Sequence, residues 1–483
     1  MSIVALARRL ERRLGVDALV RDATALRAYE CDGLTSHREI PALVVLPETT
    51  EQVAEAVRLC ADAQIPFVAR GAGTGLSGGA LAPPGGVVIA TTRMRAILSV
   101  DTVNQRLVAQ PGVTNREISQ AVAAHGLYYA PDPSSQVVCT IGGNVAENSG
   151  GAHCLKYGFT THHVLALELV TADGEIVQLG TALPEAPGYD LRGLVVGSEG
   201  TLGIVTAVTV RLLPLPEAVR TLVADFASPA AAGDAVTGIV GAGITPAAVE
   251  MLDALAIQAC EAATGAGFSP DAGAALIVEL DGPADEVDAE FAEVERICHA
   301  RGATRVRVAV DGAERELIWR GRKAAFAAMG RLSPDYLVQD GVIPRTRLGE
   351  VLAGIAALAS QAGLRVANVF HAGDGNLHPL VLYDAAAGEA ALAEELSKAV
   401  LALCVQAGGS ITGEHGVGVD KACAMPLVFG EEDLAVMARV RDAFDPAGLC
   451  NPGKVLPTPR LCGDRPGPYR PHPLEAAGVI ERW

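Results

Sequence analysis

Residues 65–80 read I-P-F-V-A-R-G-A-G-T-G-L-S-G-G-A, an apolar strand that leads directly into a glycine-rich loop. Glycines at this spacing let successive backbone N–H groups converge on an anion such as a pyrophosphate. A Rossmann loop would open a helix here, yet P-P-G-G (83–86) and another strand, V-V-I-A-T (87–91), follow almost at once. A Walker loop would need Gly-Lys-Ser/Thr, which is missing. We predict an anion-binding loop of another type, with a simple tight turn as the alternative.

Two further glycine segments make a ligand the better interpretation. They are T-I-G-G-N-V-A-E-N-S-G-G (140–151) and G-S-E-G-T-L-G-I-V-T (197–206). Glycine permits close approach of backbone to a bound molecule, so three such loops in one region predict one extended ligand.

The spacing of apolar residues predicts an α+β protein. Residues 41–90 alternate strand, helix and strand, and Thr49 with Gln52 forms a capping pattern before the helix. Hairpins are expected over 97–110 and 164–180, and a β-branched strand ends at Pro214. The predicted domains are a first domain at 1–215 (segment 1–40, core 41–215), a second domain at 216–458 and an extended tail at 459–483.

The second domain carries its own pattern. Apolar strands alternate with alanine-rich helices over residues 216–365, for example in T-L-V-A-D-F (221–226) and the helix at 286–302. We expect an antiparallel sheet with helices on one side.

Composition excludes several classes of protein. The 483 residues are 50% hydrophobic, which exceeds what a disordered chain contains, and the net charge of −18 opposes binding to nucleic acid. None of the ten cysteines forms a C-x-x-C pair, so no iron–sulfur cluster or structural zinc site is predicted. The sequence shows neither a signal peptide nor an apolar run of about 20 residues. We expect a cytoplasmic protein that reaches the inner face of a membrane only through partners.

Histidines and a glutamate in the C-terminal half predict a metal site. The segment 365–382 reads as two strands joined by Gly-Asp-Gly, which places His371 and His378 on adjoining arms of a hairpin. Glu414 and His415 lie in the glycine-rich segment G-E-H-G (413–416). Two imidazoles and a carboxylate suit zinc, manganese, cobalt or iron(II). The alternative is that each histidine only satisfies a polar neighbour.

The three glycine segments, together with P-D-P-S-S (131–135), resemble the FAD-binding domain of the vanillyl-alcohol-oxidase superfamily. The resemblance implies a two-subdomain FAD-binding domain and an α+β substrate domain. Loop 70–80 contains no histidine for covalent attachment, so noncovalent FAD is expected. The implied contacts are Arg70, Gly71, Ala72, Gly73, Thr74, Gly75, Leu76 and Ser77 at the diphosphate, Pro131, Asp132, Ser134, Gly142, Gly143, Asn144, Asn148 and Ser149 along ribityl and isoalloxazine, and Gly200, Gly203, Ile204 and Val205 near the adenosine.

With the histidine motifs added, the chain resembles the FAD-linked 2-hydroxy-acid dehydrogenase family over about residues 41–457. This resemblance implies that His371, His378 and Glu414 bind a divalent metal, with zinc the first choice. It also implies that His415 is the general base, that Arg322 pairs with the C1 carboxylate of the substrate and that Asn376 contacts the substrate. A metal on the substrate hydroxyl would lower its pKa, His415 would accept the proton, and the C2 hydride would pass to flavin.

The expected substrate is a small 2-hydroxy acid. Relatives that oxidise hydroxyglutarate carry a lysine where this chain has Val338, two residues before D-G-V-I-P (340–344). The segment W-R-G-R-K-A-A-F (319–326) and the proline-rich tail resemble the glycolate-oxidising branch most, so glycolate oxidation to glyoxylate is expected, with D-lactate oxidation to pyruvate as the alternative. The resemblance implies electron transfer to a partner subunit or quinone, with an iron–sulfur subunit and a second FAD-domain subunit as partners.

Two other functions stay open on the sequence. One is a noncatalytic subunit that keeps the FAD-type fold for assembly. The other is a flavoenzyme for a nonacid substrate such as an alcohol or sugar, which would need neither the metal site nor Arg322.

Overall fold

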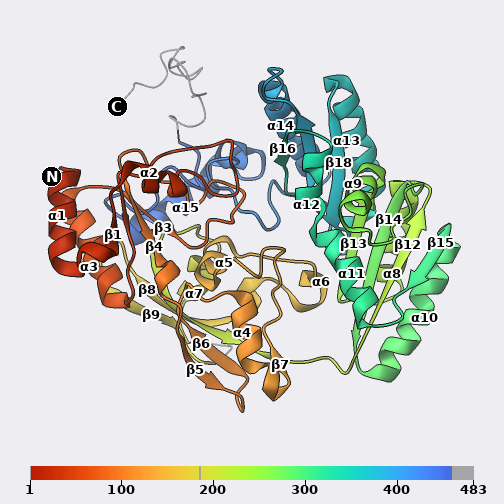
Figure 1. The fold of residues 1–483 in the computed structure, drawn as a ribbon, viewed down its shortest axis with the longest axis horizontal. Helices are drawn as coiled ribbons and strands as arrows, with labels where there is room; N and C mark the ends of the chain where they lie inside the picture. The colour runs from red at the N-terminus through yellow and green to blue at the C-terminus, as the bar shows by residue number, and fades with distance from the viewer. Residues whose placement is uncertain (1, 184–186, 459–483) are drawn as a thin grey trace.

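The computed structural model describes residues 2–183 and 187–458, which form two parts joined near residue 215 (Figure 1). The first part begins with a sheet of order β1-β2-β4-β3, whose strands β2, β4 and β3 run parallel. Helices α1 and α3 pack against it through a shared apolar cluster. The bounds are α1 Ile3–Leu14, β1 Leu19–Val20, α2 Ala23–Leu26, β2 Leu43–Val45, α3 Thr50–Ala63, β3 Phe67–Arg70 and β4 Val87–Ala90.

An antiparallel sheet of order β5-β6-β10-β8-β9 completes the first part. Both predicted hairpins are present, as β5/β6 and β8/β9, and Thr114 with Glu117 forms a full capping box at the start of α4. The bounds are β5 Ile97–Asp101, β6 Arg106–Ala109, α4 Asn115–Val122, β7 Leu127–Tyr128, α5 Ile141–Glu147, α6 Cys154–Tyr157, β8 Val164–Val170, β9 Ile176–Gly180, α7 Leu191–Val195, β10 Ile204–Arg211 and β11 Leu213–Pro214.

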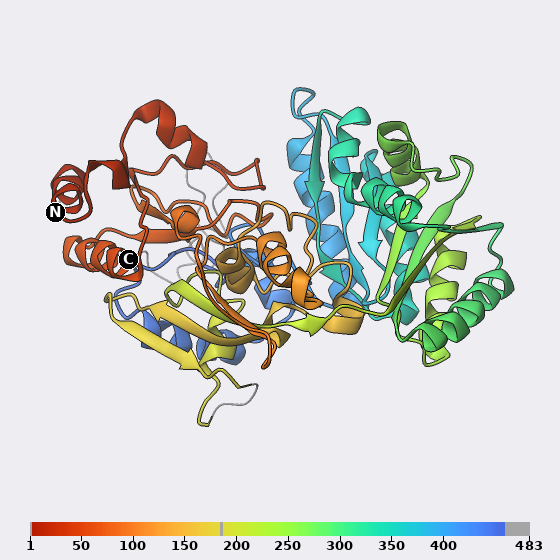
Figure 2. The same ribbon diagram turned by 60° about the horizontal axis from the view of Figure 1, so that its bottom comes forward.

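The second part is built on one large antiparallel sheet (Figure 2). Its order is β15-β12-β14-β13-β18-β19-β17, and β20 pairs with both β18 and β16. The strands are β12 Ala218–Phe226, β13 Ala248–Asp253, β14 Ala274–Gly282, β15 Arg305–Val308, β16 Asp335–Val338, β17 Gly341–Val342, β18 Arg365–His371, β19 Asn376–Leu377 and β20 Pro379–Tyr383. Its helices are α8 Pro229–Gly241, α9 Ala254–Thr264, α10 Ala284–Ala300, α11 Gly312–Lys323, α12 Ala325–Ala328, α13 Leu348–Ala362 and α14 Ala390–Gln406. One more helix, α15 Glu431–Phe444, follows them in the chain.

Helices cover both faces of this large sheet, so the prediction of a one-sided cover is wrong. Helices α8, α10, α13 and α14 pack on one face, and α9, α11 and α12 pack on the other. Leu222 and Ala224 point to the first group, whereas Val223 between them points to the second. Central strands apolar at successive positions are buried on both faces, and this is the physical reason for the difference.

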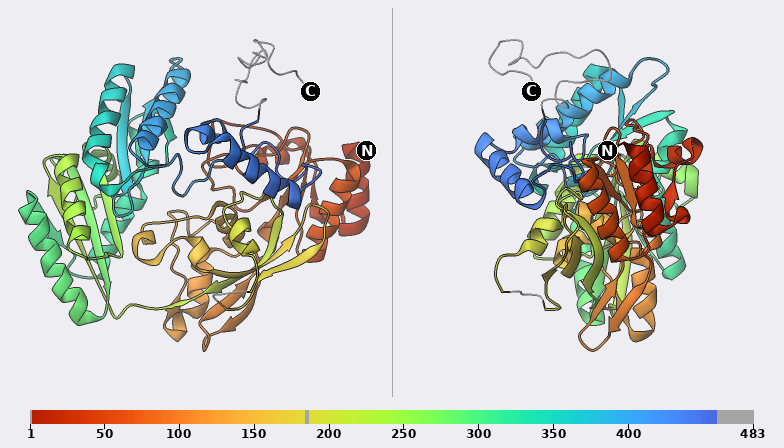
Figure 3. Two further views of the ribbon diagram at one scale, coloured as in Figure 1. Left: turned by 180° about the vertical axis from the view of Figure 1, so that it is seen from behind. Right: turned by 90° about the vertical axis from the view of Figure 1, so that its left-hand side faces the viewer.

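The end of the described chain returns to the first part. Helix α15 and the residues after it lie against the N-terminal half (Figure 3). The backbone N–H of Phe67 donates to the carbonyl of Leu449, and Asn451 N–H donates to the carbonyl of Phe67. Residues near 450 thus extend the first sheet, although the chain reaches them only after crossing the second part. The predicted extended tail at 459–483 lies outside the described residues.

Candidate active site

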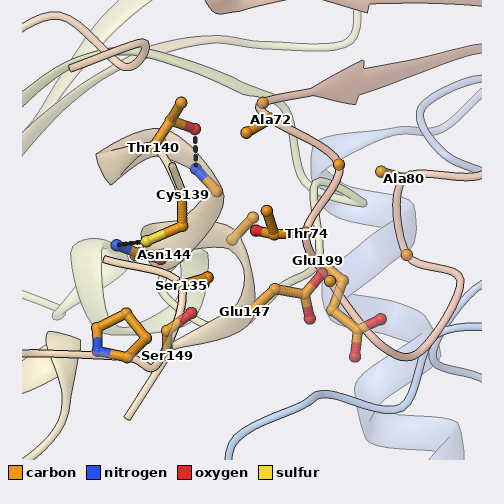
Figure 4. A pocket seen from close by; sticks show the side chains of 18 of the residues that line it. Ala72, Thr74, Ala80, Ser135, Cys139, Thr140, Asn144, Glu147, Ser149 and Glu199 are labelled. Atoms are coloured by element: carbon orange, nitrogen blue, oxygen red, sulfur yellow. Dashed lines mark hydrogen bonds between the residues drawn. The ribbon is translucent and has the colours of Figure 1, made fainter. Parts of the chain in front are cut away.

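A cavity runs between the two parts, and the three glycine loops line most of it (Figure 4). The end of the cavity in the second part is lined by Arg322, Phe326, His371, His378, Glu414 and His415. The predicted cofactor residues on its wall are Arg70, Gly71, Ala72, Gly73, Thr74, Gly75, Leu76, Ser134, Gly142, Gly143, Asn144, Ser149, Gly200, Gly203, Ile204 and Val205. The structure therefore brings the three glycine loops and the predicted metal residues to one cavity.

Glycine is required where the first two loops meet. A Cβ on Gly71 would lie 2.3 Å from Thr140 Oγ1, so no larger residue fits without displacing the Thr140 side chain. Thr140 itself caps α5 by accepting from Gly143 N–H. The glycines thus allow the two loops to pack together and leave the cavity lined mainly by backbone and small side chains.

Some predicted cofactor residues brace these loops. The Arg70 guanidinium donates to the carbonyl of Cys31 at 2.8 Å, beneath the first loop. Ser77 is fully buried outside the cavity lining, and its carbonyl accepts from the N–H groups of Val419 and Asp420. Backbone contacts of this kind fix the shape of the first loop.

Pro131, Asp132 and Asn148 also lie outside the cavity lining. The carbonyl of Pro131 accepts a hydrogen bond from the Asn115 side chain. Asn148 ends α5 in the left-handed conformation, with φ of 51°, and its Oδ1 accepts from Thr161 N–H. Asp132 Oδ2 forms an ion pair with His153 Nδ1 at 2.9 Å.

His153 joins the two parts of the molecule. Its Nε2 lies 3.1 Å from Glu279 Oε1 on β14, and Glu279 also accepts from Arg315 and Trp319 on α11. Burial would lower the pKa of His153, but Asp132 and Glu279 outweigh it and raise that pKa to about 10. The protonated imidazole thus links a loop of the first part to the helix that carries Arg322.

The predicted metal residues converge at the end of the hairpin. His371 closes β18, its register partner is Asn376 on β19, and the rings of His371 and His378 are 5.1 Å apart. Glu414 Oε1 lies 3.3 Å from His371 Nε2 and 3.1 Å from His378 Nε2. One ligand atom from each of the three residues lies within 4.8 Å of the others.

This donor set suits a divalent cation. His378 Nε2 is buried, and within the described residues its 3.1 Å contact with Glu414 Oε1 does not have the geometry of a hydrogen bond. Burial opposes charge on Glu414, but the adjoining His371 lowers the pKa of Glu414 well below its ordinary value. Two imidazoles and an ionised carboxylate that face an open cavity leave coordination positions for a substrate.

His415 lies beside the metal residues without joining their set. Its ring stacks on that of His378, with centroids 4.8 Å apart and planes within 5°. Within the described chain its buried Nδ1 lacks a hydrogen-bond partner. A second possible ligand group, Asp340 with His378 and His415, shares this corner of the site.

Asp340 holds the loop that carries Glu414 and His415, a role that the sequence analysis missed. Its Oδ2 accepts from Thr412 Oγ1 at 2.6 Å, Gly413 N–H at 2.9 Å and His415 N–H at 2.8 Å. Burial would raise the pKa of Asp340, but His415 and Lys421 lower it. The only signal in the sequence was its place in the D-G-V-I-P-R motif.

The same loop is held from the first part by Glu199. Glu199 accepts from Val417 N–H at 2.6 Å and from Gly418 N–H at 2.7 Å. Glu147 lies beside it on the cavity wall (Figure 4). Burial and the negative charge of Glu199 raise the pKa of Glu147 well above its ordinary value. The sequence analysis predicted no role for Glu147 or Glu199.

Arg322 and Asn376 differ in their relation to the cavity. Arg322 lines it and is 4% exposed, and its Nε has no hydrogen-bond partner in the described structure. Its Nη2 forms an ion pair of 2.6 Å with Glu250, another buried carboxylate that the sequence analysis missed. Asn376 is buried outside the cavity lining, against Gly413. Its predicted contact with the substrate stays a prediction.

Comparison with known protein families gives a match for each of the two parts. Residues 41–180 match the family described as FAD binding domain, and residues 215–455 match FAD linked oxidases, C-terminal domain. The glycolate oxidase subunit GlcD of Escherichia coli strain K12 is 53% identical over 437 residues, covering 90% of this chain and 88% of that protein. The chain belongs to the FAD-linked oxidase family.

Further relatives and a solved structure support this family and the predicted fold. The glycolate oxidase subunit GlcD of Bacillus subtilis is 37% identical and covers 89% of this chain and 92% of its own. A D-lactate dehydrogenase of Anaerostipes hadrus is 34% identical, with 86% and 89% covered. A solved structure of p-cresol methylhydroxylase has a TM-score of 0.79 at 17% identity, covering 94% of this chain and 96% of that one. The predicted α+β fold of the vanillyl-alcohol-oxidase type is confirmed.

The family assignment confirms FAD as the cofactor of this FAD-linked oxidase. The cavity fits it, because glycine loops and small side chains leave backbone groups open along an extended path. Among the helices in the described part of the chain, none is long and apolar enough to cross a membrane.

Proposed function

We propose that this FAD-linked oxidase converts glycolate to glyoxylate. The observation that carries the proposal is the meeting of Arg322, His415 and the His371–His378–Glu414 cluster at one end of the cavity lined by the FAD loops. A guanidinium suits a carboxylate, and an adjoining metal site and imidazole suit the hydroxyl of a 2-hydroxy acid. A nonacid substrate would need neither group.

The residues have separate tasks. Arg322 binds the C1 carboxylate with the donors that Glu250 leaves free. When bound, FAD accepts the C2 hydride and a divalent cation lowers the pKa of the substrate hydroxyl. His415 accepts the hydroxyl proton, and stacking on His378 fixes the plane of its ring. Phe326 borders the same end of the cavity and excludes water beside His378.

The cofactors follow from the same residues. His371, His378 and Glu414 hold the cation, with zinc first and manganese, cobalt or iron(II) as alternatives. FAD is held noncovalently, since residues 70–80 contain no histidine. Elemental analysis of the purified protein identifies the metal, and release of FAD on acid precipitation tests the noncovalent linkage.

D-lactate is the second candidate substrate. Relatives named D-lactate dehydrogenase from Anaerostipes hadrus and Archaeoglobus fulgidus are 34% and 33% identical to this chain. D-lactate differs from glycolate by one methyl group, which a hydrophobic pocket distinguishes by only about tenfold or somewhat more.

Electron transfer partners belong to this proposal. Relatives from two bacteria are named as subunits, and this chain lacks the cysteine spacing of an iron–sulfur protein. We propose that an iron–sulfur subunit and a second FAD-domain subunit receive the electrons, in the cytoplasm and at the inner face of the membrane. Copurification of the tagged chain with its partners and iron analysis of that complex test this assembly.

The deciding experiment is anaerobic reduction of the bound flavin. Glycolate, D-lactate and D-2-hydroxyglutarate are each added to protein loaded with FAD and metal, with and without a chelator, and flavin absorbance is followed. We expect fast bleaching by glycolate, slower bleaching by D-lactate, and loss of both with the chelator. No bleaching by any of the three would contradict the proposal and favour a noncatalytic subunit or a nonacid substrate.

A further inference from the structure

Glu250 occupies an unusual position for a carboxylate. It lies in the centre of β13, within A-V-E-M-L-D (248–253), and is 0% exposed. Strand β13 pairs on one side with β14 and on the other with β18 (Figure 1). The register with β18 places Glu250 directly opposite His371. Opposed residues of antiparallel strands point to the same face, so this register aims Glu250 at His371.

Both oxygens of Glu250 are engaged, each by a different part of the site. Oε1 accepts from His371 Nδ1 at 2.6 Å, and Oε2 forms the 2.6 Å ion pair with Arg322 Nη2. Val249 and Met251 face the opposite side of the sheet, and Glu250 therefore points toward α11, which carries Arg322. One carboxylate thus touches a predicted metal ligand and the predicted substrate arginine.

We infer that Glu250 is a positioning residue that couples metal binding by His371 to carboxylate binding by Arg322. The inference rests on the proposed function for the role of Arg322. Because a carboxylate only accepts, His371 Nδ1 must carry the proton, which leaves the Nε2 lone pair free to bind a cation that Glu414 also ligates. The same carboxylate fixes one edge of the guanidinium, so Nε and the remaining donors stay free for the substrate.

The test is the variant Glu250→Gln in the FAD-loaded protein. Glutamine keeps the size of the side chain but removes the charge and turns one acceptor into a donor. We expect zinc affinity, measured by competition with a chromophoric chelator, to fall about 10- to 100-fold. We expect KM for glycolate to rise on the order of tenfold through loss of the Arg322 orientation, with unchanged FAD content.

Glu279→Gln is the matched control. Glu279 is also a buried carboxylate on the neighbouring strand β14, with ion pairs of its own, but it contacts Arg315, His153, Trp319 and Thr221. Its replacement should lower the melting temperature and leave zinc affinity unchanged. If Glu250→Gln fails to fold, Glu250→Asp keeps the charge and shortens the side chain, so it should lose one of the two contacts and reduce zinc affinity by a smaller factor.

The outcomes separate this inference from the proposed function. The positioning role would be overturned if Glu250→Gln kept the zinc affinity and the KM of the wild type. It would also be overturned if Glu250→Gln and Glu279→Gln lost zinc affinity equally. The zinc measurement needs no substrate. If no 2-hydroxy acid reduces the wild-type flavin but Glu250→Gln still loses zinc, the substrate proposal fails and the link from Glu250 to the metal site stands.

Discussion

The two ends of the cavity differ in the groups that they offer to a ligand. The glycine wall, formed by residues 71–76, 142–144, 200 and 203–205, presents mainly backbone and uncharged side chains. The charged wall, formed by Arg322, His371, His378, Glu414 and His415, presents buried ionisable groups from four segments of the second part. A large cofactor is bound by shape and backbone, whereas proton and hydride removal need charge at defined atoms. Substitutions in the glycine wall should therefore weaken FAD binding, whereas substitutions in the charged wall should slow the reaction.

The largest effect is expected at the charged wall. His415→Gln removes the general base, and we expect the rate of flavin reduction by glycolate to fall about 10²- to 10⁴-fold in anaerobic stopped flow. FAD and metal contents should stay at wild-type values. The same substitution at exposed His125 serves as the control and should change nothing. Loss of FAD from His415→Gln would show that the two walls are not separate.

Gly71→Ala tests the glycine wall. The new Cβ would meet Thr140 Oγ1 at 2.3 Å, so the Thr140 side chain that caps α5 must move, at a cost of up to about 3 kcal/mol. We expect FAD affinity, measured by fluorescence on titrating apoprotein, to fall on the order of a hundredfold, with normal zinc affinity. Gly241→Ala, where a Cβ meets nothing within 4 Å, is the control. Unchanged FAD binding would mean that the close approach of the loops is dispensable.

His153→Gln tests the connection between the two parts of the molecule that carry these walls. The pKa of His153 is about 10 in the folded protein and about 6.5 when unfolded. A raised pKa stabilises the fold fully below pH 6.5, and this stabilisation is lost as pH rises toward 10. Wild type should exceed the variant by about 2 kcal/mol in free energy of unfolding at pH 6, and the gap should close by pH 10. A gap independent of pH in denaturant melts would argue against the charged link, and exposed His299→Gln provides the baseline.

The smallest effect concerns the choice between the two candidate substrates. The Phe326 ring meets His378 edge-on, with centroids 5.9 Å apart, and borders the cavity. Phe326→Ala opens space beside His378 at this end of the cavity, and we expect kcat/KM for D-lactate relative to glycolate to rise about tenfold. Phe429→Ala, which changes a half-buried phenylalanine away from the cavity, should leave the ratio unchanged. A fixed ratio in both variants would exclude Phe326 from substrate selection.

Much of the fold and part of the site could be predicted from local pattern. The caps at Thr49 and Thr114, both hairpins and the convergence of His371 with His378 depend on residues a few positions apart, where chain geometry alone decides. The prediction that helices cover only one face of the large sheet is wrong. An apolar strand shows that its side chains are buried, but it does not show which helices pack on each face.

The sequence alone determined the glycine loops, the histidine and glutamate motifs, and through them the family, because these are short segments whose chemistry is visible in one reading. Only the tertiary structure decided which charged groups support them. Glu250 and His371 are 121 residues apart and meet through sheet register, and Glu199 reaches Val417 from the other part of the molecule. A buried carboxylate is tolerated only where its partners arrive. In this protein strand pairing and the packing of the two parts bring those partners into contact. Neither can be predicted from the spacing of residues within a short segment.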